Sequence, residues 1–244
     1  MSDSYRQGVQ YFGGLMFKPS ELPFRRKTWV DLAAIPMNRR GWELSDCTDV
    51  TQDVLDRLGQ WIKAAKDGKI ILAEGSKACG RGLLLYGASG HGKSTLALAV
   101  LQQVIKDFPI EVFGVKPSGT LVRPAYFIQY PTLVDLRGTL MDDPTANEVR
   151  LWEGIMGECK EDAYNVRVLV IDDVRREHRS GTEWSRNLLH QVLRTRYSNG
   201  LPTIITSNHS LDKWGNLYGD HTESFAQEAF MPLEIKSPGG DLRK

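Results

Sequence analysis

The sequence predicts an α/β protein with a mainly parallel sheet and helices on both faces. Short, nearly continuous apolar runs occur at residues 82–86, 168–171 and 203–206, and each is followed by small or acidic residues. Segments with apolar residues at helical spacing lie between these runs. Strands buried on both faces of a parallel sheet have this composition, and the alternation of strand and helix is typical of the class.

The composition is that of an ordinary globular protein. The 244 residues are 41% hydrophobic and 25% charged, with 31 Lys+Arg against 30 Asp+Glu, which excludes the disordered and fibrous classes. A formal net charge of +1 provides no overall attraction to nucleic acid. Any DNA affinity must therefore come from local patches, or from several subunits that present the same patch.

Neither a membrane protein nor a secreted, disulfide-stapled scaffold is indicated. No apolar run approaches the roughly 18 to 20 residues that cross a bilayer, and no apolar signal segment opens the chain. The cysteines Cys47, Cys79 and Cys159 are too widely spaced to indicate a zinc site or a disulfide framework. We expect no membrane association and a cytoplasmic location, in a bacterial cell or a phage-infected host.

Residues 1–50 are predicted to form a basic and aromatic arm in front of the domain at residues 51–244. Pro19, Pro23 and Pro36 interrupt any long helix, so short elements in an irregular chain are expected. The aromatic faces and cations of the arm suit contact with single-stranded DNA. Docking of a partner protein, or packing of the aromatic residues onto the domain, explains the same composition equally well.

The elements of the domain follow in order. Apolar residues at helical spacing predict an amphipathic helix over residues 51–66. The strand at 82–86 leads through a glycine-rich turn to a helix over 93–106. Asn199 and Gly200 provide a left-handed cap for a later helix. The remaining predictions are a strand at 125–130, a helix that starts at 131–133, a helix at 146–163, a strand at 168–171, a helix at 182–197, a strand at 203–206 and a last strand at 232–236.

The glycine-rich turn carries the strongest chemical signal. It fits the pattern G-x-x-x-x-G-K-[ST] and lies between a strand and a helix, as this phosphate-binding motif requires. Its glycines let successive backbone amides point at phosphates, where the helix N-terminus adds partial positive charge. Lys93 would neutralise the outer phosphates of ATP or ADP, and Ser94 would offer its hydroxyl to Mg²⁺. The predicted nucleotide-binding residues are Gly87, Ala88, Ser89, Gly90, His91, Gly92, Lys93, Ser94 and Thr95.

Two carboxylates follow the apolar run at residues 168–171. A parallel strand delivers them to its carboxyl end, where such sheets place ligands. Asp172 would hold Mg²⁺, directly or through water, and Asp173 would polarise the attacking water as a general base. A strand that ends in a solvated acidic turn is the plainer interpretation, and the phosphate loop disfavours it.

The run at residues 203–206 ends in Ser207 and Asn208. An Asn at the same sheet edge can orient water beside the γ-phosphate, and alone it would indicate only a polar turn. The chain has no Asn-Lys-x-Asp guanine-reading motif, so a GTPase is disfavoured.

Together these motifs resemble the AAA+ ATPases of the DnaC and IstB type, which are replicative helicase loaders and transposition helpers. The resemblance covers residues 82–243 and includes the stretch LRTRYSNGLPTIITSN at residues 193–208. It is most specific over residues 196–214. It implies a P-loop NTPase fold of the AAA+ (ASCE) type with a reduced or absent lid. It also implies that residues 87–95 are Walker A, Asp172 and Asp173 Walker B, and Asn208 sensor 1.

The resemblance further implies partners and an assembly. Members form rings or spirals with ATP between subunits and single-stranded DNA in the centre. The implied partners are single-stranded DNA, a DnaB-type replicative helicase or a transposase, and further copies of the chain in an ATP-dependent homo-oligomer. Residues 125–137 lie roughly where such proteins place DNA-contacting elements.

Two departures from the family pattern affect catalysis. The family usually carries Glu or Asp at the second Walker B position, so Asp173 is acceptable there, and its shorter side chain is expected to slow hydrolysis. Residues 219–225 contain no arginine where the family has a segment with a trans-acting finger. Arg196 is one candidate for that catalytic role. The other candidates are Arg194 and the cluster Arg175, Arg176 and Arg179, and each of these arginines is also compatible with an ordinary solvated charge.

Other functions remain as alternatives. A small-molecule P-loop kinase would need a mobile lid with phosphate-gripping arginines and an acceptor pocket, and neither is evident. A nucleotide-gated binding module with little turnover is compatible with the missing finger.

Overall fold

The structure is a computed structural model that describes residues 10–12, 15–17, 22–48, 50–71, 78–109, 112, 121–174 and 183–236. The strands are β1 (Gln10–Phe12), β2 (Leu15–Phe17), β3 (Gly82–Tyr86), β4 (Ala125–Gln129), β5 (Val168–Val174), β6 (Thr203–Ser207) and β7 (Phe230–Glu234). The helices are α1 (Leu22–Leu32), α2 (Gln52–Lys66), α3 (Lys93–Asp107), α4 (Tyr130–Asp142), α5 (Ala146–Met156), α6 (Glu183–Ser198), α7 (Trp214–Tyr218) and α8 (Asp220–Ala229).

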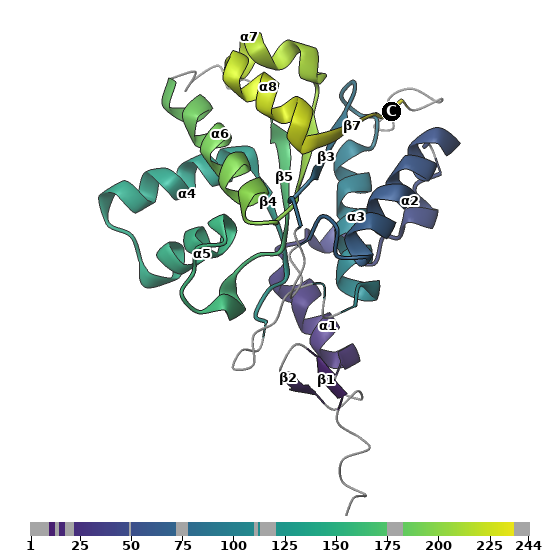
Figure 1. Cartoon of the computed structure of the whole chain (residues 1–244), viewed down its shortest axis with the longest axis vertical. Coiled ribbons are helices and arrows are strands. Elements are labelled where there is room, and N and C mark those ends of the chain that lie inside the picture. Colours follow the sequence, from purple (N-terminus) through teal and green to yellow (C-terminus); the bar gives the residue numbers. More distant parts are fainter. Residues whose placement is uncertain are drawn as a thin grey trace, which may run out of the picture.

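Five strands form one parallel sheet in the order β4-β5-β6-β3-β7. The chain leaves β3 and returns at β4, and β5 and β6 fill the places between them (Figure 1). Strands β1 and β2 pair with each other in an antiparallel hairpin outside this sheet. The predicted parallel α/β fold is confirmed, and the carboxyl ends of all five strands lie along one edge.

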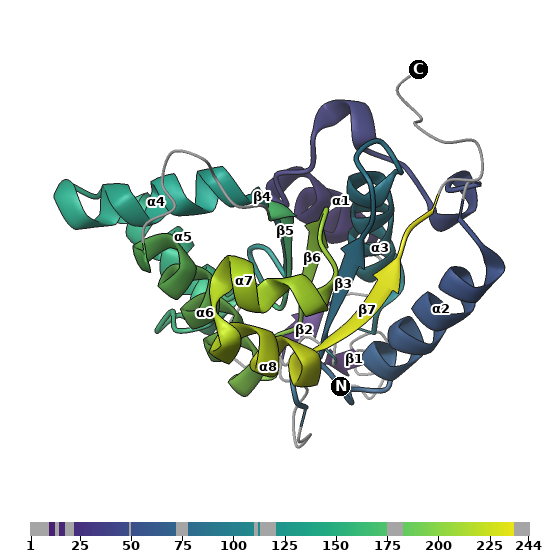
Figure 2. The ribbon, with the colours of Figure 1, turned by 90° about the horizontal axis from the view of Figure 1, so that it is seen from above.

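The sheet is covered on both faces because successive strand residues point to opposite sides. Leu83 and Leu85 of β3 pack in a core with α1, α2 and α3. Leu84 between them belongs to the second core, with α4, α5, α6, α7 and α8. Val170 and Ile171 of β5 divide between the two cores in the same way. Seen from above, the two groups of helices lie on opposite sides of the sheet (Figure 2).

Residues 22–48 of the arm pack onto the domain. Trp29 of α1 is buried, and its indole Nε1 donates to the Leu121 carbonyl at 2.9 Å. The Arg26 guanidinium caps the carboxyl end of α3 by donating to the carbonyls of Ile105 and Phe108, at 2.6 and 2.9 Å. The predicted division at residue 50 therefore does not separate two cores.

Most predicted elements are present within one or two residues of their expected ends. The strand at 168–171 and the helix over residues 146–163 are exceptions, and the larger difference is that of the helix. That prediction is wrong at its carboxyl end, because α5 stops at Met156 and Gly157 adopts a left-handed φ of 74°. A Cβ at Gly157 would lie 2.2 Å from the Leu201 side chain. The strand predicted at 168–171 extends through both aspartates to Val174, and the last strand begins at Phe230 rather than at 232.

One predicted set of residues falls outside the described ranges. It is the cluster of candidate arginines, Arg175, Arg176 and Arg179. Within the described ranges, no helix is long and apolar enough to span a membrane.

Candidate nucleotide-binding site

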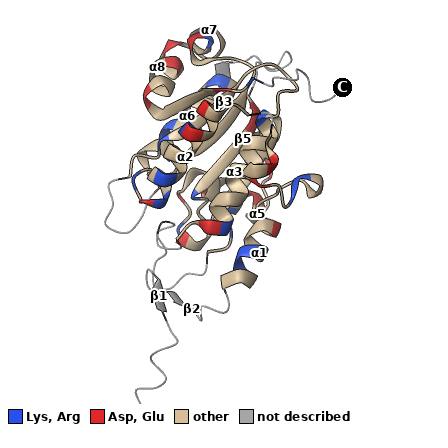
Figure 3. Cartoon of the chain, turned by 90° about the vertical axis from the view of Figure 1, so that its right-hand side faces the viewer, with Lys and Arg blue, Asp and Glu red and all other residues tan. Residues whose placement is uncertain are grey.

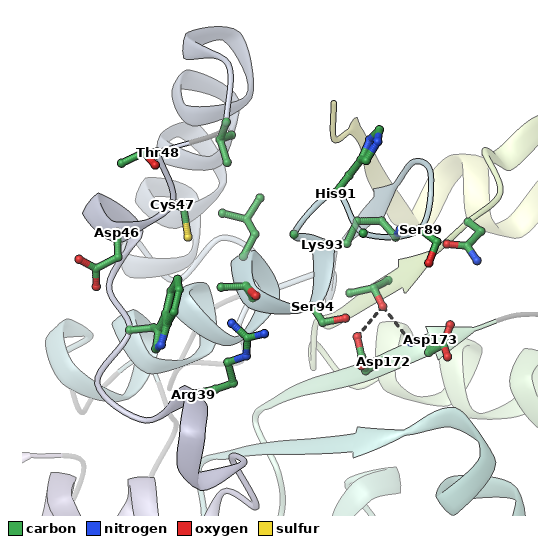
Figure 4. Close-up of a pocket in the computed structure, with 18 of the residues that line it drawn as sticks. Arg39, Asp46, Cys47, Thr48, Ser89, His91, Lys93, Ser94, Asp172 and Asp173 are labelled. Carbon is green, nitrogen blue, oxygen red and sulfur yellow. Dashed lines mark hydrogen bonds between the residues drawn. The ribbon is translucent and has the colours of Figure 1, made fainter. Parts of the chain in front are cut away.

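A cavity of about 630 Å³ lies at the carboxyl edge of the sheet (Figure 4). One side is the phosphate loop (residues 87–95) with the first turn of α3, and the floor is formed by Gln129, Asp172 and Thr206 at the ends of β4, β5 and β6. The other side is the segment that precedes α2, from Arg39 to Val50. The cavity thus brings Ser89 through Thr95 together with Asp172, Asp173 and Asn208, as the sequence predicts.

The phosphate loop owes its shape to glycines at positive φ. Gly87, Gly90 and Gly92 have φ values of 148°, 83° and 79°, which other residues rarely adopt. A Cβ at Gly87 would also lie only 2.3 Å from the Ile235 carbonyl oxygen. Lys93 folds back over the loop, and its Nζ donates to the carbonyls of Gly87 and Ala88 at 2.9 and 2.7 Å. A bound phosphate would offer this ammonium stronger, charged acceptors.

Thr206 holds the two aspartates in register with the neighbouring strand. Its Oγ1 donates to Asp172 Oδ1 at 2.6 Å and accepts from the Asp173 backbone N–H at 2.8 Å. Asp172 and Thr206 are 6% and 1% exposed, so this network lies on the buried side of the cavity. Thr206 is not among the site residues predicted from the sequence. A polar residue inside the buried apolar strand β6 is nevertheless a signal that could have indicated a role in the site.

Asp173 lies in a β-bulge. Between Ile171 and Val174, β5 contains one more residue than the paired stretch of β6, and Asp173 adopts a φ of 60°. Asp is among the few non-glycine residues that tolerate this left-handed conformation. Bulges next to active sites redirect side chains, and Asp173 lines the cavity instead of continuing the strand alternation.

The side chains around Ser94 suit a Mg²⁺ ion. Ser94 and Asp172 offer a hydroxyl and a carboxylate, the hard oxygen donors that Mg²⁺ prefers, and Figure 4 shows both side chains on the same side of the cavity. Asp172 uses Oδ1 to accept from Thr206, and Oδ2 accepts no hydrogen bond from any described residue. Among the described residues no group of three or more His, Cys, Asp or Glu could hold a metal.

Asn208 is exposed at the rim of the cavity, directly after β6. Ser207 fixes the turn before it, because its Oγ donates to the Val174 carbonyl at 2.9 Å and accepts from the His209 N–H at 3.1 Å. The turn is thereby tied to the end of the strand that carries Asp172 and Asp173. Water held by Asn208 would face the same space as these carboxylates.

Comparisons with known proteins agree with this geometry. Residues 120–227 match the family model described as IstB-like ATP binding protein. The solved structure of DnaI is 21% identical with a TM-score of 0.58, over 83% of this chain and 95% of that chain. That of the DnaC helicase loader is 24% identical with a TM-score of 0.55, over 82% of this chain and all (100%) of that chain.

The chain therefore shares the fold of DnaI and of the DnaC helicase loader, and its residues 120–227 are similar to the IstB-like ATP binding family. AMPPCP-bound DnaA from Aquifex aeolicus shares the fold at 17% identity, with a TM-score of 0.53 over 80% of this chain and 50% of that chain. No curated protein is significantly similar to this chain.

The prediction that Arg196 acts as a catalytic finger is wrong. Its side chain is completely buried, with a relative exposure of 0%. The guanidinium donates to Thr203 Oγ1 and to four backbone carbonyls, so it binds together α5, β5 and β6 from inside. Burial, with a smaller contribution from Arg167, lowers the pKa of Arg196 to about 9, which leaves it charged at neutral pH. A group with five internal acceptors cannot reach a nucleotide in another subunit.

The wall of the cavity that faces the phosphate loop was not predicted from the sequence. Arg39, Trp42, Cys47 and Val50 line it, although they belong to the segment predicted as an irregular arm. Burial raises the pKa of Cys47, with a smaller contribution from Asp46, so its thiol stays protonated at neutral pH. Prediction of this wall required the knowledge that residues 22–48 fold back onto α3.

Proposed function

We propose that the protein binds Mg-ATP and hydrolyses it slowly in order to load or remodel a DnaB-type replicative helicase on single-stranded DNA. The observation that carries this proposal is the cavity in which the Walker A loop, Asp172, Asp173 and Asn208 meet. The likeness of the fold to DnaI and to the DnaC helicase loader supports the choice of target.

Each residue of the cavity has a proposed task. Lys93 and the loop amides hold the phosphates, and Ser94 and Asp172 hold Mg²⁺, which neutralises charge on the phosphate oxygens. Asp173 accepts the proton of the attacking water as general base. Asn208 orients that water from the rim.

Slow turnover is expected because α8 offers no arginine as a finger and Arg196 is enclosed in the core. Helix α8 contains acidic residues and no Lys or Arg (Figure 3), and Arg196 is buried in the core. Arg194, which is exposed on α6 with its guanidinium 5.8 Å from the Phe225 ring centroid, is the remaining described candidate for a finger. Stabilisation of the transition state in trans would then depend on a neighbouring copy or on the partner protein.

The proposed partners are single-stranded DNA, the helicase and further copies of this chain in an ATP-dependent homo-oligomer. A solved structure of the replication initiator DnaA contains AMPPCP and single-stranded DNA, and it shares the fold of this chain at a TM-score of 0.51. A replicative helicase as target would place the protein in the cytoplasm of a bacterial cell or a phage-infected host.

A second candidate function is that of an IstB-like transposition helper, which presents target DNA to a transposase. The match of residues 120–227 to the IstB-like model favours it specifically. A nucleotide-gated module with little turnover is a third candidate, and the lack of a finger arginine in α8 favours that one.

A capture experiment separates these functions. The immobilised protein, with ATP or ADP, is presented with a purified DnaB-type hexamer and, separately, with an IS21-class transposase. Retention of the helicase in the ATP state, lost in Lys93→Ala, is the expected result. Retention of the transposase alone would replace the loader proposal with the helper.

A further inference from the structure

A buried amide on α3 reaches away from the phosphates toward the opposite wall of the cavity. Gln102 is 8% exposed, and its Oε1 accepts from the Gly41 N–H at 2.7 Å. Its Nε2 donates to the carbonyls of Arg39 and Trp42, at 3.0 and 3.2 Å. One side chain thus binds the backbone of residues 39–42 on both sides of Gly41, which has a φ of 81°.

The backbone that Gln102 holds carries two side chains that line the nucleotide cavity. The Arg39 guanidinium lies over the Trp42 ring, 5.2 Å from its centroid, and both residues line the cavity. In Figure 4 the Arg39 side chain points from this wall toward the side of Ser94 and Asp172.

The guanidinium of Arg39 lacks a polar partner in the described part of the chain. It makes no hydrogen bond or ion pair there. The guanidinium of the next residue, Arg40, has two polar partners by comparison, since it donates to Asp31 Oδ1 at 2.7 Å and to the Ile35 carbonyl at 3.2 Å. The Arg39 guanidinium is therefore stacked on the Trp42 indole before any ligand binds, and it lines the cavity wall opposite the phosphate loop.

We propose that Gln102 is a positioning residue that holds Arg39 and Trp42 as the nucleoside-binding wall of the ATP cavity. The proposal rests on the proposed function, in that the cavity binds ATP. Planar cations and indoles stack on bases, and side chains fixed before binding lose less conformational freedom when the ligand arrives. Because Gln102 is part of the helix that begins with Lys93, it also keeps this wall at a fixed distance from the phosphate loop.

Simple attachment of the arm to the domain does not require Gln102. The Arg26 bonds to the end of α3 and the buried Trp29 already hold α1 in place. Gln102 instead fixes the backbone conformation of the turn at residues 39–42 through its hydrogen bonds. Its removal should therefore affect binding of the nucleoside part and leave binding of the phosphates intact.

The test compares two probes, Mg-ATP and Mg-bound inorganic tripolyphosphate, by calorimetric titration of the full chain. For Gln102→Leu we expect ATP affinity to fall about 10-fold, the scale of one lost stacking contact, and tripolyphosphate affinity to stay within about 2-fold. The matched control is Gln103→Leu, because the half-buried Gln103 is the next residue of α3 and its side chain donates to Asp107 on the same helix rather than to residues 39–42. Both of its affinities should equal those of the wild type.

A double-mutant cycle shows whether Gln102 acts through the wall. Trp42→Ala alone should reproduce the selective loss of ATP affinity, and Gln102→Leu in that background should add little. Trp42→Phe should restore most of the affinity, since it keeps a stacking face. These Trp42 variants and Arg39→Ala also carry the test if Gln102→Leu fails to fold.

Three results would overturn the proposal. The first is full ATP affinity in Arg39→Ala and Trp42→Ala, and the second is an equal loss for both probes in Gln102→Leu. The third is additivity of the two substitutions in the cycle. Failure of the wild type to bind either probe would be a different result, because it would overturn the proposed function itself and this proposal with it.

Discussion

At the scale of single residues, Lys93 is restrained before any phosphate is bound. Its ammonium donates to two carbonyls of its own loop, and a nucleotide would replace these with charged oxygens. Hydrogen bonds to charged groups contribute about 1.5–3 kcal/mol, so Lys93→Ala should weaken Mg-ATP binding by at least about 10-fold. Calorimetric titration measures this, with Lys66→Ala at the end of α2 as control. Equal affinity of Lys93→Ala and the wild type would show that ATP binds elsewhere.

Asp173 can be tested without disturbing its backbone. Asn tolerates the left-handed conformation as Asp does, so Asp173→Asn should keep the bulge and the hydrogen bond that the backbone N–H of residue 173 donates to Thr206 Oγ1. We expect near-normal ATP affinity and a fall in turnover of about 100-fold or more, as for the loss of a general base. Phosphate release under saturating ATP is the measurement, with the exposed Asp135→Asn on α4 as control. Unchanged turnover in Asp173→Asn would assign the base elsewhere.

Arg196 supports the fold, so its loss should appear in stability. Arg196→Met removes a donor from four buried carbonyls, of which that of Pro202 still accepts from the Leu169 N–H. Each group that stays unsatisfied costs about 1–3 kcal/mol. Urea unfolding should show a loss of at least about 3 kcal/mol. Arg194→Met is the matched surface variant and should change the unfolding free energy by less than about 0.5 kcal/mol. Similar stability of the two variants would contradict the structural role of Arg196.

The site residues that sequence reasoning found are those held together by motif spacing. Lys93 and Ser94 belong to one loop, and parallel strands must bring Asp172 and Asn208 to the same edge. Thr206 and Arg196 depend on the register of β5 against β6 and on which helix residue the core encloses. One sequence does not specify that register, so their roles became visible only in the folded chain.

At the scale of elements, α1 is a part of the core. It lies against α3, and Trp29 is 2% exposed while Phe24 on the same helix is 75% exposed. Trp29→Ala should destabilise the protein by about 3–5 kcal/mol, and Phe24→Ala should have little effect. Thermal unfolding of the two variants compares them directly. A small effect of Trp29→Ala would mean that the arm is separable from the domain.

The buried strands were predictable and the arm was not, for a physical reason. A strand enclosed on both faces is apolar at nearly every position, so β3, β5 and β6 stand out in the sequence. Helix α1 has no such pattern, since Trp29 is its one buried residue. Its place depends on single long-range contacts, such as those of Arg26 and Trp29, which no local periodicity reveals.

At the scale of the whole molecule, ATP, DNA and assembly should depend on one another. The net charge of +1 gives one copy little general attraction for DNA, so an assembly that presents the same patch several times is needed for tight binding. We expect single-stranded DNA to be bound more tightly with ATP than with ADP, and less tightly as salt increases. Fluorescence anisotropy with a labelled oligonucleotide at two salt concentrations tests this, and equal affinity with both nucleotides would contradict it.

We propose that ATP bound in the cavity drives assembly of the protein on single-stranded DNA. The most direct test measures phosphate release and mass in solution together, for wild type and Lys93→Ala, with and without single-stranded DNA. The wild type should form an ATP-dependent oligomer with slow turnover that DNA accelerates, and Lys93→Ala should do neither. A wild-type protein that remains monomeric with ATP, and whose turnover ignores DNA, would contradict the account.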